Sequence, residues 1–200
     1  MNRPSRISNV TKDYLQEFHC ILEEMIEGMT SAELTDSISH NFIVQMIPHH
    51  KAAIKMCKNI LRFTTNLAIQ DIATGIIEEQ SKSIQDMEEI LCCCSEDENS
   101  PKDLERYQSG INNIMQHMFS AMENARASNE INCNFMWEMI PHHKGAVDMC
   151  ETTQAYPICP ELEPILNSII VSQRRGIRQM QELLQRMQCG GNRQRGFWFM

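Results

Sequence analysis

The sequence lacks the features by which membrane proteins and nucleic-acid-binding proteins are recognised. No apolar run approaches the roughly 20 residues that a membrane-spanning helix needs. The formal net charge is −8 and the isoelectric point is near 5.4, so the chain has no general basic field for a nucleic acid. We therefore expect neither a membrane span nor a nucleic-acid partner.

Aromatic residues are scarce, at 6% of the 200-residue chain, yet apolar residues still make up 42% and charged residues 22%. That balance is ordinary for globular proteins and excludes wholesale disorder. A chain of this length buries about 70% of its unfolded surface, which allows one core without disulfides. Sulfur is what the chain has in excess, with 15 Met and 9 Cys.

An apolar signal segment is missing from the first residues, which begin Met1-Asn-Arg-Pro-Ser and soon turn polar. We therefore expect a cytoplasmic protein whose thiols stay reduced. The nine cysteines are an odd number, and Cys92, Cys93 and Cys94 are consecutive. Neither fact suits a secreted disulfide framework.

The chain contains an internal duplication. Residues 41–58 read NFIVQMIPHHKAAIKMCK and residues 134–151 read NFMWEMIPHHKGAVDMCE, with identity at eleven of the eighteen positions. The same offset of 93 residues carries Tyr14 onto Tyr107 without a gap. We therefore predict a single domain over 1–200, built from repeats at about 14–94 and 107–187. The tail 190–200 is predicted to be disordered.

Apolar residues recur at steps of three and four, which predicts helices almost throughout. Long helical pairs are expected at about 40–62 with 67–93, and at about 132–155 with 161–188. Pro101 and Pro160 stand where the first residue of a helix would be. Because no stretch alternates in the manner of a strand, the expected fold class is all-α, a four-helix bundle with additional methionine-containing helices.

Both histidines of each repeated pair lie on the apolar face of their predicted helix. Imidazole and thioether are neutral donors and thiolate is soft, so this set suits Cu(I), or Ag(I) as its mimic, better than Mg²⁺, Ca²⁺ or Mn²⁺. Because a metal binds the unprotonated ring, we expect binding to weaken as the histidines protonate. We predict a Cu(I) site whose candidate ligands are His49, His50, His142, His143, Met46, Met139, Cys57 and Cys150.

Further methionines follow the same offset on the helices that flank the histidine helices. As candidate thioether ligands they compete with a simpler interpretation, because methionine also fills gaps in a core. The additional candidates are Met25, Met29, Met87, Met118, Met122 and Met180. Gln80 and Gln173 lie on the core face, and each is expected to hydrogen-bond a histidine and fix its tautomer.

Two other functions stay open on the residues alone. One is a di-metal oxidoreductase, which is disfavoured because no histidine has a glutamate three residues before it, as carboxylate-bound iron sites require. The other is a metal-free structural or sensory bundle. No zinc-protease motif, phosphate loop or nucleophile elbow is present, so we do not expect an enzyme. The oligomeric state is open.

The duplicated motif Met-Ile-Pro-His-His-Lys, followed one helix later by Gln-x6-Met, resembles the DUF305 family. The resemblance covers about 40–91 and 133–184. It implies a ferritin-like helical fold and copper ligation by His49, His50, His142, His143 and nearby methionines. It also implies a role in copper tolerance or delivery, and members of this family are commonly exported.

Overall fold

The computed structural model describes residues 7–187 and 189. They form six helices and, within this part of the chain, no strand, so the all-α prediction is confirmed. The predicted disordered tail, 190–200, lies outside the described residues. None of the helices in the described part is long and apolar enough to cross a membrane. The helices are α1 (Asn9–Thr30), α2 (Ile38–Leu61), α3 (Leu67–Cys94), α4 (Pro101–Glu123), α5 (Ile131–Thr153) and α6 (Leu162–Arg186).

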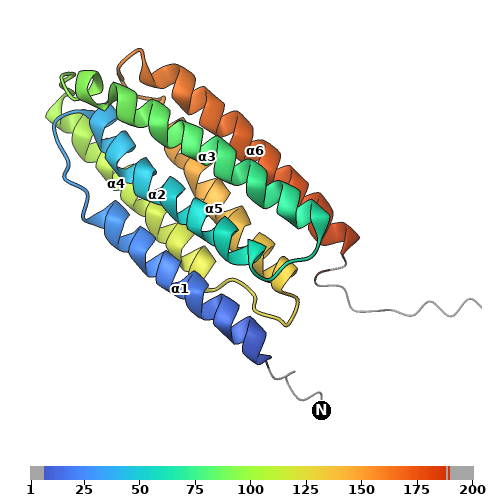
Figure 1. Cartoon of the computed structure of the whole chain (residues 1–200). Coiled ribbons are helices and arrows are strands. Elements are labelled where there is room, and N and C mark those ends of the chain that lie inside the picture. The colour runs from blue at the N-terminus through green and yellow to red at the C-terminus, as the bar shows by residue number, and fades with distance from the viewer. Residues whose placement is uncertain (1–6, 188, 190–200) are drawn as a thin grey trace, which may run out of the picture.

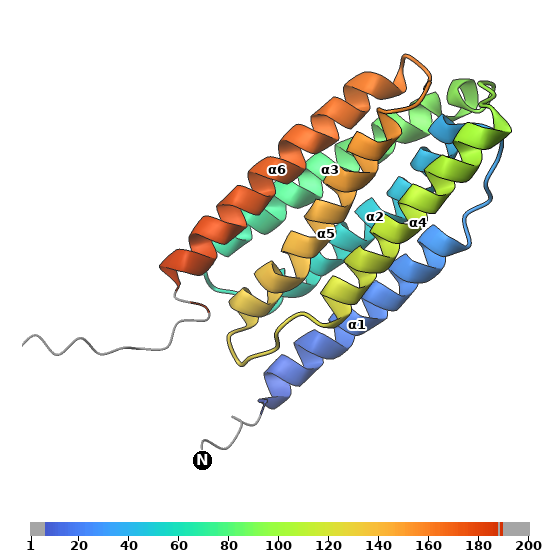
Figure 2. The ribbon, with the colours of Figure 1, turned by 180° about the vertical axis from the view of Figure 1, so that it is seen from behind.

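The helices lie in three layers of two (Figures 1 and 2). The two histidine-bearing helices, α2 and α5, form the middle layer. On one side α3 and α6 complete a four-helix bundle with them, and on the other side α1 and α4 add the methionine-containing helices that the sequence predicts. Because the middle helices are covered on two faces, they bury side chains around more of their circumference than the outer helices do.

Four helices begin at a side-chain cap, which satisfies a backbone N–H that the first turn leaves free. The capping residues are Ser8, Ser37, Asn66 and Ser100. Pro101 is the first residue of α4, as predicted. The same expectation is wrong for Pro160, because the Cys159 N–H is bound by the Ser39 hydroxyl at 2.9 Å and α6 begins only at Leu162.

Two disulfides join parts of the chain that are distant in sequence. Cys94, at the end of α3, is bonded to Cys159, and Cys133, at the start of α5, is bonded to Cys189. The expectation of reduced thiols is wrong for these four cysteines, because folding brings together residues separated by 65 and 56 positions. The compartment itself stays a prediction.

Helices α1 and α4 each make a close contact with their histidine-bearing helix at a glycine. In the first repeat, a Cβ on Gly28 of α1 would lie 2.8 Å from the Cβ of Pro48 in α2. In the second repeat the glycine is on the other partner, because the Met118 side chain of α4 fills the space beside Gly145 of α5. Proline cannot rotate away, so the contact at Gly28 leaves no room for a larger residue.

The contact between Gly28 and Pro48 predicts that Gly28→Ala destabilises the protein. Overpacking costs about 1–3 kcal/mol, which the better helix propensity of alanine offsets only in part. Gly75→Ala is the matched control, because an added Cβ there meets nothing within 4 Å. It should stabilise the protein by about 0.5–1 kcal/mol. Urea unfolding followed by far-ultraviolet circular dichroism measures both, and equal effects of the two changes would contradict this packing.

Candidate metal centre

The two histidine pairs meet at the centre of the middle layer, where α2 packs against α5 (Figure 1). The rings of His49 and His142 are stacked, with centroids 3.6 Å apart and planes inclined by 26°. Both are fully buried, as is His50, and His143 is only 2% exposed. Since His49 and His142 are equivalent positions of the duplication, the repeats meet face to face at this stack, in the manner of a two-fold interface.

Reciprocal hydrogen bonds fix the state of the two stacked rings. His49 Nε2 lies 3.2 Å from the carbonyl oxygen of His142, and His142 Nε2 lies 3.1 Å from the carbonyl oxygen of His49. A carbonyl oxygen only accepts, so each Nε2 carries the proton and donates it. In a neutral ring the lone pair is then on Nδ1. Histidines that bind metals commonly hold their second nitrogen in this way.

The four Nδ1 atoms have few hydrogen-bond partners in the protein. Those of His142 and His143 are buried and without a hydrogen-bond partner. His49 Nδ1 lies 3.5 Å from His50 Nδ1, at the limit of a hydrogen bond. Buried polar atoms are normally paired, so unpaired nitrogens at the centre of a bundle require an explanation.

The outer histidines of the two pairs have different neighbours. His50 Nε2 lies 3.2 Å from the hydroxyl of Ser83 in α3. The residue equivalent to Ser83 is Gly176 in α6, where an added Cβ would lie 2.9 Å from two atoms of the His143 ring. The His143 ring therefore lies directly against the backbone of α6, whereas a side chain covers His50.

Burial keeps all four imidazoles uncharged. Desolvation lowers the pKa of His50 to about 3 and that of His142 to about 4, and it lowers the pKa of His49 and of His143 well below the usual range. Neighbouring imidazoles lower the pKa of His49, His50 and His143 further, because two protonated rings would repel. Protonation of these rings in the folded protein therefore begins well below the ordinary pKa of histidine, and the expected weakening of metal binding on protonation stays a prediction.

The nitrogen pair of the first repeat has a spacing that fits one metal ion. Metal–nitrogen bonds are about 2.0–2.1 Å long, so two nitrogens on one ion stand about 3.3 Å apart at a tetrahedral angle and about 4.1 Å apart in a line. The observed 3.5 Å between the Nδ1 atoms of His49 and His50 falls in that range. Within residues 7–187 and 189, no three His, Cys, Asp or Glu side chains converge on one point. The buried thioethers are therefore the candidates for a further soft ligand.

Two predicted thioether ligands lie one helical turn from the outer histidine of each pair. His50 touches Ser83, and α2 runs antiparallel to α3. Met46 precedes His50 by four residues on α2, and Met87 follows Ser83 by four residues on α3. Because the two helices are antiparallel, both methionines lie on the same side of the His50–Ser83 contact, about 6 Å along the helices. Met139 and Met180 have the same relation to His143 and Gly176. All four methionines are fully buried.

The other predicted methionines lie on the outer layer, on α1 and α4. They are buried between these helices and the middle layer, and they are Met25, Met29, Met118 and Met122. Met118 packs beside Gly145 and lines a groove of about 210 Å³ with the exposed His117. These methionines are packed between layers, and their role as ligands stays a prediction.

The predicted thiol ligands Cys57 and Cys150 are separated from the imidazoles. Each follows the outer histidine of its pair by seven residues, about 10 Å along the helix. Both are free and buried, and burial raises the pKa of each thiol well above its usual range. Without a metal, burial therefore favours the protonated thiols, and their role as ligands stays a prediction.

The prediction that two glutamines hydrogen-bond the histidines is wrong. Gln80 and Gln173 do not hydrogen-bond an imidazole; both side-chain polar atoms of Gln80 and the Oε1 of Gln173 are buried without a partner. Ser83 occupies that role at His50, because it is one turn further along α3. The duplication could have indicated its importance, since its counterpart is glycine.

Sequence reasoning also missed a buried carboxyl group. Glu138 is 1% exposed and accepts a 2.5 Å hydrogen bond from the Tyr14 hydroxyl. Burial raises the pKa of Glu138 to about 8, although the hydrogen bond from Tyr14 opposes this. Its counterpart in the first repeat is Gln45, which is also buried. The sequence could have indicated this residue, because equivalent positions of the two repeats carry an amide in one and an acid in the other.

The chain is similar to one described family and to solved structures of the same fold. A model of the family "Domain of unknown function (DUF305)" matches residues 39–184. A crystal structure of a DUF305 fragment from Deinococcus radiodurans is 23% identical, with a TM-score of 0.54 over 74% of this chain and 96% of that one. CopM in an Ag-bound form obtained by soaking is 24% identical, with a TM-score of 0.56 over 76% and 98%. These likenesses establish the fold, and no curated protein matches the chain.

The buried neutral histidines predict that the metal-free protein loses stability in acid. The histidines of the unfolded chain become protonated below about pH 6.5, whereas His50 and His142 in the folded protein become protonated only near pH 3 to 4. The unfolded state therefore binds more protons between these values, and the free energy of unfolding falls as the pH falls. Each histidine contributes up to about 1.4 kcal/mol per pH unit in that window. Urea unfolding at pH 7, 6 and 5 measures the decline. A constant free energy of unfolding across that range would contradict it.

Glu138 acts in the opposite sense and supplies the control. With its pKa raised to about 8, the folded state holds a proton that the unfolded chain releases above 4.5, so this group lowers stability as the pH rises from 4.5 to 8. Glu138→Gln copies the residue of the first repeat and removes this opposing contribution. The variant should therefore lose stability more steeply than the natural protein between pH 7 and 5.

Proposed function

The chain belongs to the DUF305 family, and we propose that it is a soft-metal-binding protein that holds Cu(I) or Ag(I) on its histidine pairs, as a sequestration or carrier protein. Each pair would bind one ion. The ligand atoms would be the Nδ1 atoms of His49 and His50 in the first repeat, and of His142 and His143 in the second.

The unpaired Nδ1 lone pairs carry this proposal. Two of the four atoms have no hydrogen-bond partner, and the other two face each other at 3.5 Å. The rings of His49 and His142 are held by bonds from Nε2 to a backbone carbonyl, and His50 Nε2 contacts the Ser83 hydroxyl. A metal ion would satisfy the buried lone pairs without moving those contacts.

The charge of the site favours a monovalent ion. The four imidazoles are neutral, and the buried carboxyl of Glu138 is bound to Tyr14. A divalent ion would therefore bring two uncompensated charges into the core, and the cost of burying an ion rises steeply with its charge. Cu(I) and Ag(I) carry one charge and accept nitrogen and thioether donors.

The fold neighbours add support from outside the chain. One of the solved structures with this fold is that of CopM in its Ag-bound form. Silver is the usual mimic of Cu(I), and the imidazole and thioether donors in the core of this chain suit both ions.

Replacing one histidine pair should remove one ion and leave the other. We expect His49→Phe with His50→Phe to abolish one Ag(I) or Cu(I) site, and His142→Phe with His143→Phe to abolish the second, because phenylalanine keeps the ring volume without a donor. Titration of the protein with both disulfides intact against a chromophoric competitor gives the stoichiometry, and circular dichroism confirms folding.

The matched control replaces histidines outside the core. His19 and His117 are exposed, so His19→Ala with His117→Ala should leave both sites unchanged. Equal stoichiometry in the natural protein and in both pair variants would refute the proposal, as would loss of binding in the control alone.

The buried methionines beside His50 give a second test of the same site. Leucine has nearly the volume of methionine, so Met46→Leu with Met87→Leu should change the free energy of unfolding by less than about 1.5 kcal/mol. We expect Cu(I) affinity at the first pair to fall by about tenfold or more, since a thioether ligand is lost. Unchanged affinity would show that imidazoles alone hold the ion.

A further inference from the structure

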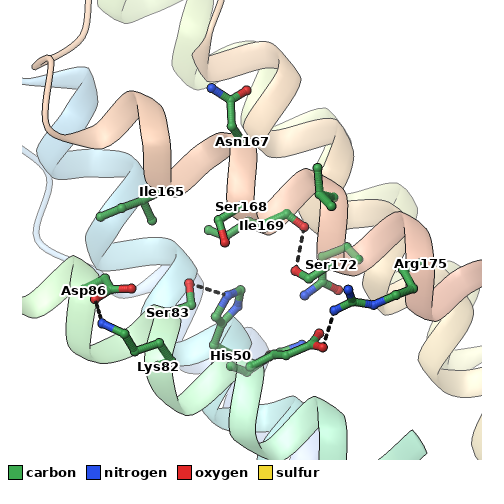
Figure 3. Close-up of a pocket in the computed structure, with 14 residues that line it drawn as sticks. His50, Lys82, Ser83, Asp86, Ile165, Asn167, Ser168, Ile169, Ser172 and Arg175 are labelled. Atoms are coloured by element: carbon green, nitrogen blue, oxygen red, sulfur yellow. Dashed lines mark hydrogen bonds and ion pairs between the residues drawn. The ribbon is translucent and has the colours of Figure 1, made fainter.

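A cavity of about 470 Å³ lies between α3 and α6 and reaches His50 (Figure 3). In Figure 3 the imidazole of His50 lies between the two helices with its ring toward Ser83. Lys82, Asp86 and Ser168 are among the residues that line the cavity. His50 itself is fully buried, so the Ser83 side chain covers it at the inner end.

The inner wall of this cavity carries polar atoms without partners. Gln80 and Gln173 line it, are 2% and 3% exposed, and leave buried amide atoms without hydrogen bonds. Amide oxygens in this state attract water or a cation, and a cavity of this size has room for several water molecules. Because neither polar atom of the Gln80 side chain has a hydrogen bond to break, this amide can reorient toward a passing ion.

The second repeat has a counterpart that is much smaller. A cavity of about 160 Å³ is lined by His143, Gly176 and Gly75. These residues are equivalent to His50, Ser83 and Ser168 at the offset of 93. The two cavities are therefore the same feature of each repeat, and each leads to the outer histidine of one pair.

The two cavities share one ion pair and differ in their other charged residues. Arg175 of α6 reaches across to Glu79 of α3, and both residues line both cavities. The equivalent residues are Lys82 and Ser172. Serine offers no carboxylate, and Lys82 instead pairs with Asp86 on its own helix. Among the residues that line the wide cavity, no second ion pair therefore joins α3 to α6.

We propose that the wide cavity is the route by which a metal cation enters and leaves the His49–His50 pair, and that the His142–His143 pair exchanges more slowly through the narrow one. This inference rests on the proposed function. Gln80, Gln173 and Ser83 are the side chains along the route, and the ion exchanges water for their oxygens before it reaches the imidazole. The two pairs thus differ in rate of loading although their ligands are the same.

The first experiment tests the route without metal. Diethyl pyrocarbonate acylates unprotonated imidazole nitrogens, and peptide mass spectrometry reports each histidine separately. We expect His50 to be modified faster than His143, with the exposed His19 and His117 as references for full access. Ser168→Trp, which places a large ring at the mouth, should slow modification of His50 by about tenfold or more, as closure of an entrance does. Gly75→Trp is the equivalent change at the narrow cavity and should leave His50 unaffected.

The second experiment tests the route with the ion itself. Stopped-flow mixing with Ag(I) measures loading of the His49–His50 pair in protein that also carries His142→Phe and His143→Phe. Ser168→Trp should lower the loading and release rates together and leave the equilibrium affinity unchanged, because it touches no ligand. Gly75→Trp should again have no effect on this pair.

The outcomes separate the two proposals. If His50 and His143 are acylated equally fast, or if Ser168→Trp slows neither acylation nor loading, the route is wrong even when Ag(I) binds. If acylation follows the expected pattern but Ag(I) does not bind the histidine pairs, the proposed function is wrong and the cavity is only an opening to His50. Circular dichroism of both tryptophan variants excludes a change of fold.

Discussion

The structure depends on the contact between His49 and His142. Two polar rings are stacked in the centre of an apolar bundle, and each donates to the backbone carbonyl of the other. This reciprocal contact joins the two repeats at the centre of the bundle, sets the tautomers of both rings and leaves their lone pairs on Nδ1. A buried polar group without a partner is costly, so a fold built around four imidazoles must satisfy them or supply a ligand.

The departures from the duplication matter as much as the duplication. Ser83 and Gly176, Glu79 and Ser172, and Gln45 and Glu138 are equivalent pairs that differ in charge or size. Each difference falls at the histidine layer or at an entrance to it. The histidines are identical in both repeats, so the surroundings, and not the ligands, distinguish the two pairs.

Sulfur has several roles here. Methionine fills the interfaces between layers at Met118 and lies beside the histidines at Met46 and Met87. Four cysteines form disulfides that do not follow the duplication, since Met187 stands at the position equivalent to Cys94. Cys57 and Cys150 are buried thiols whose pKa is raised by burial. The excess of sulfur in the composition is therefore a sum of packing residues, cross-links and candidate ligands.

The sequence by itself determined the helices, the repeat and the buried face of each histidine pair. These follow from local periodicity and from self-similarity, which need no knowledge of distant contacts. Only the tertiary structure decided which nitrogen of the two stacked rings is free, that Ser83 and not Gln80 contacts His50, that Glu138 is held by Tyr14, and which cysteines are cross-linked. Each of these facts depends on the rotation of one helix against another. A shift of a single turn exchanges the neighbours of a side chain, and helical periodicity gives the buried face but not that relative position.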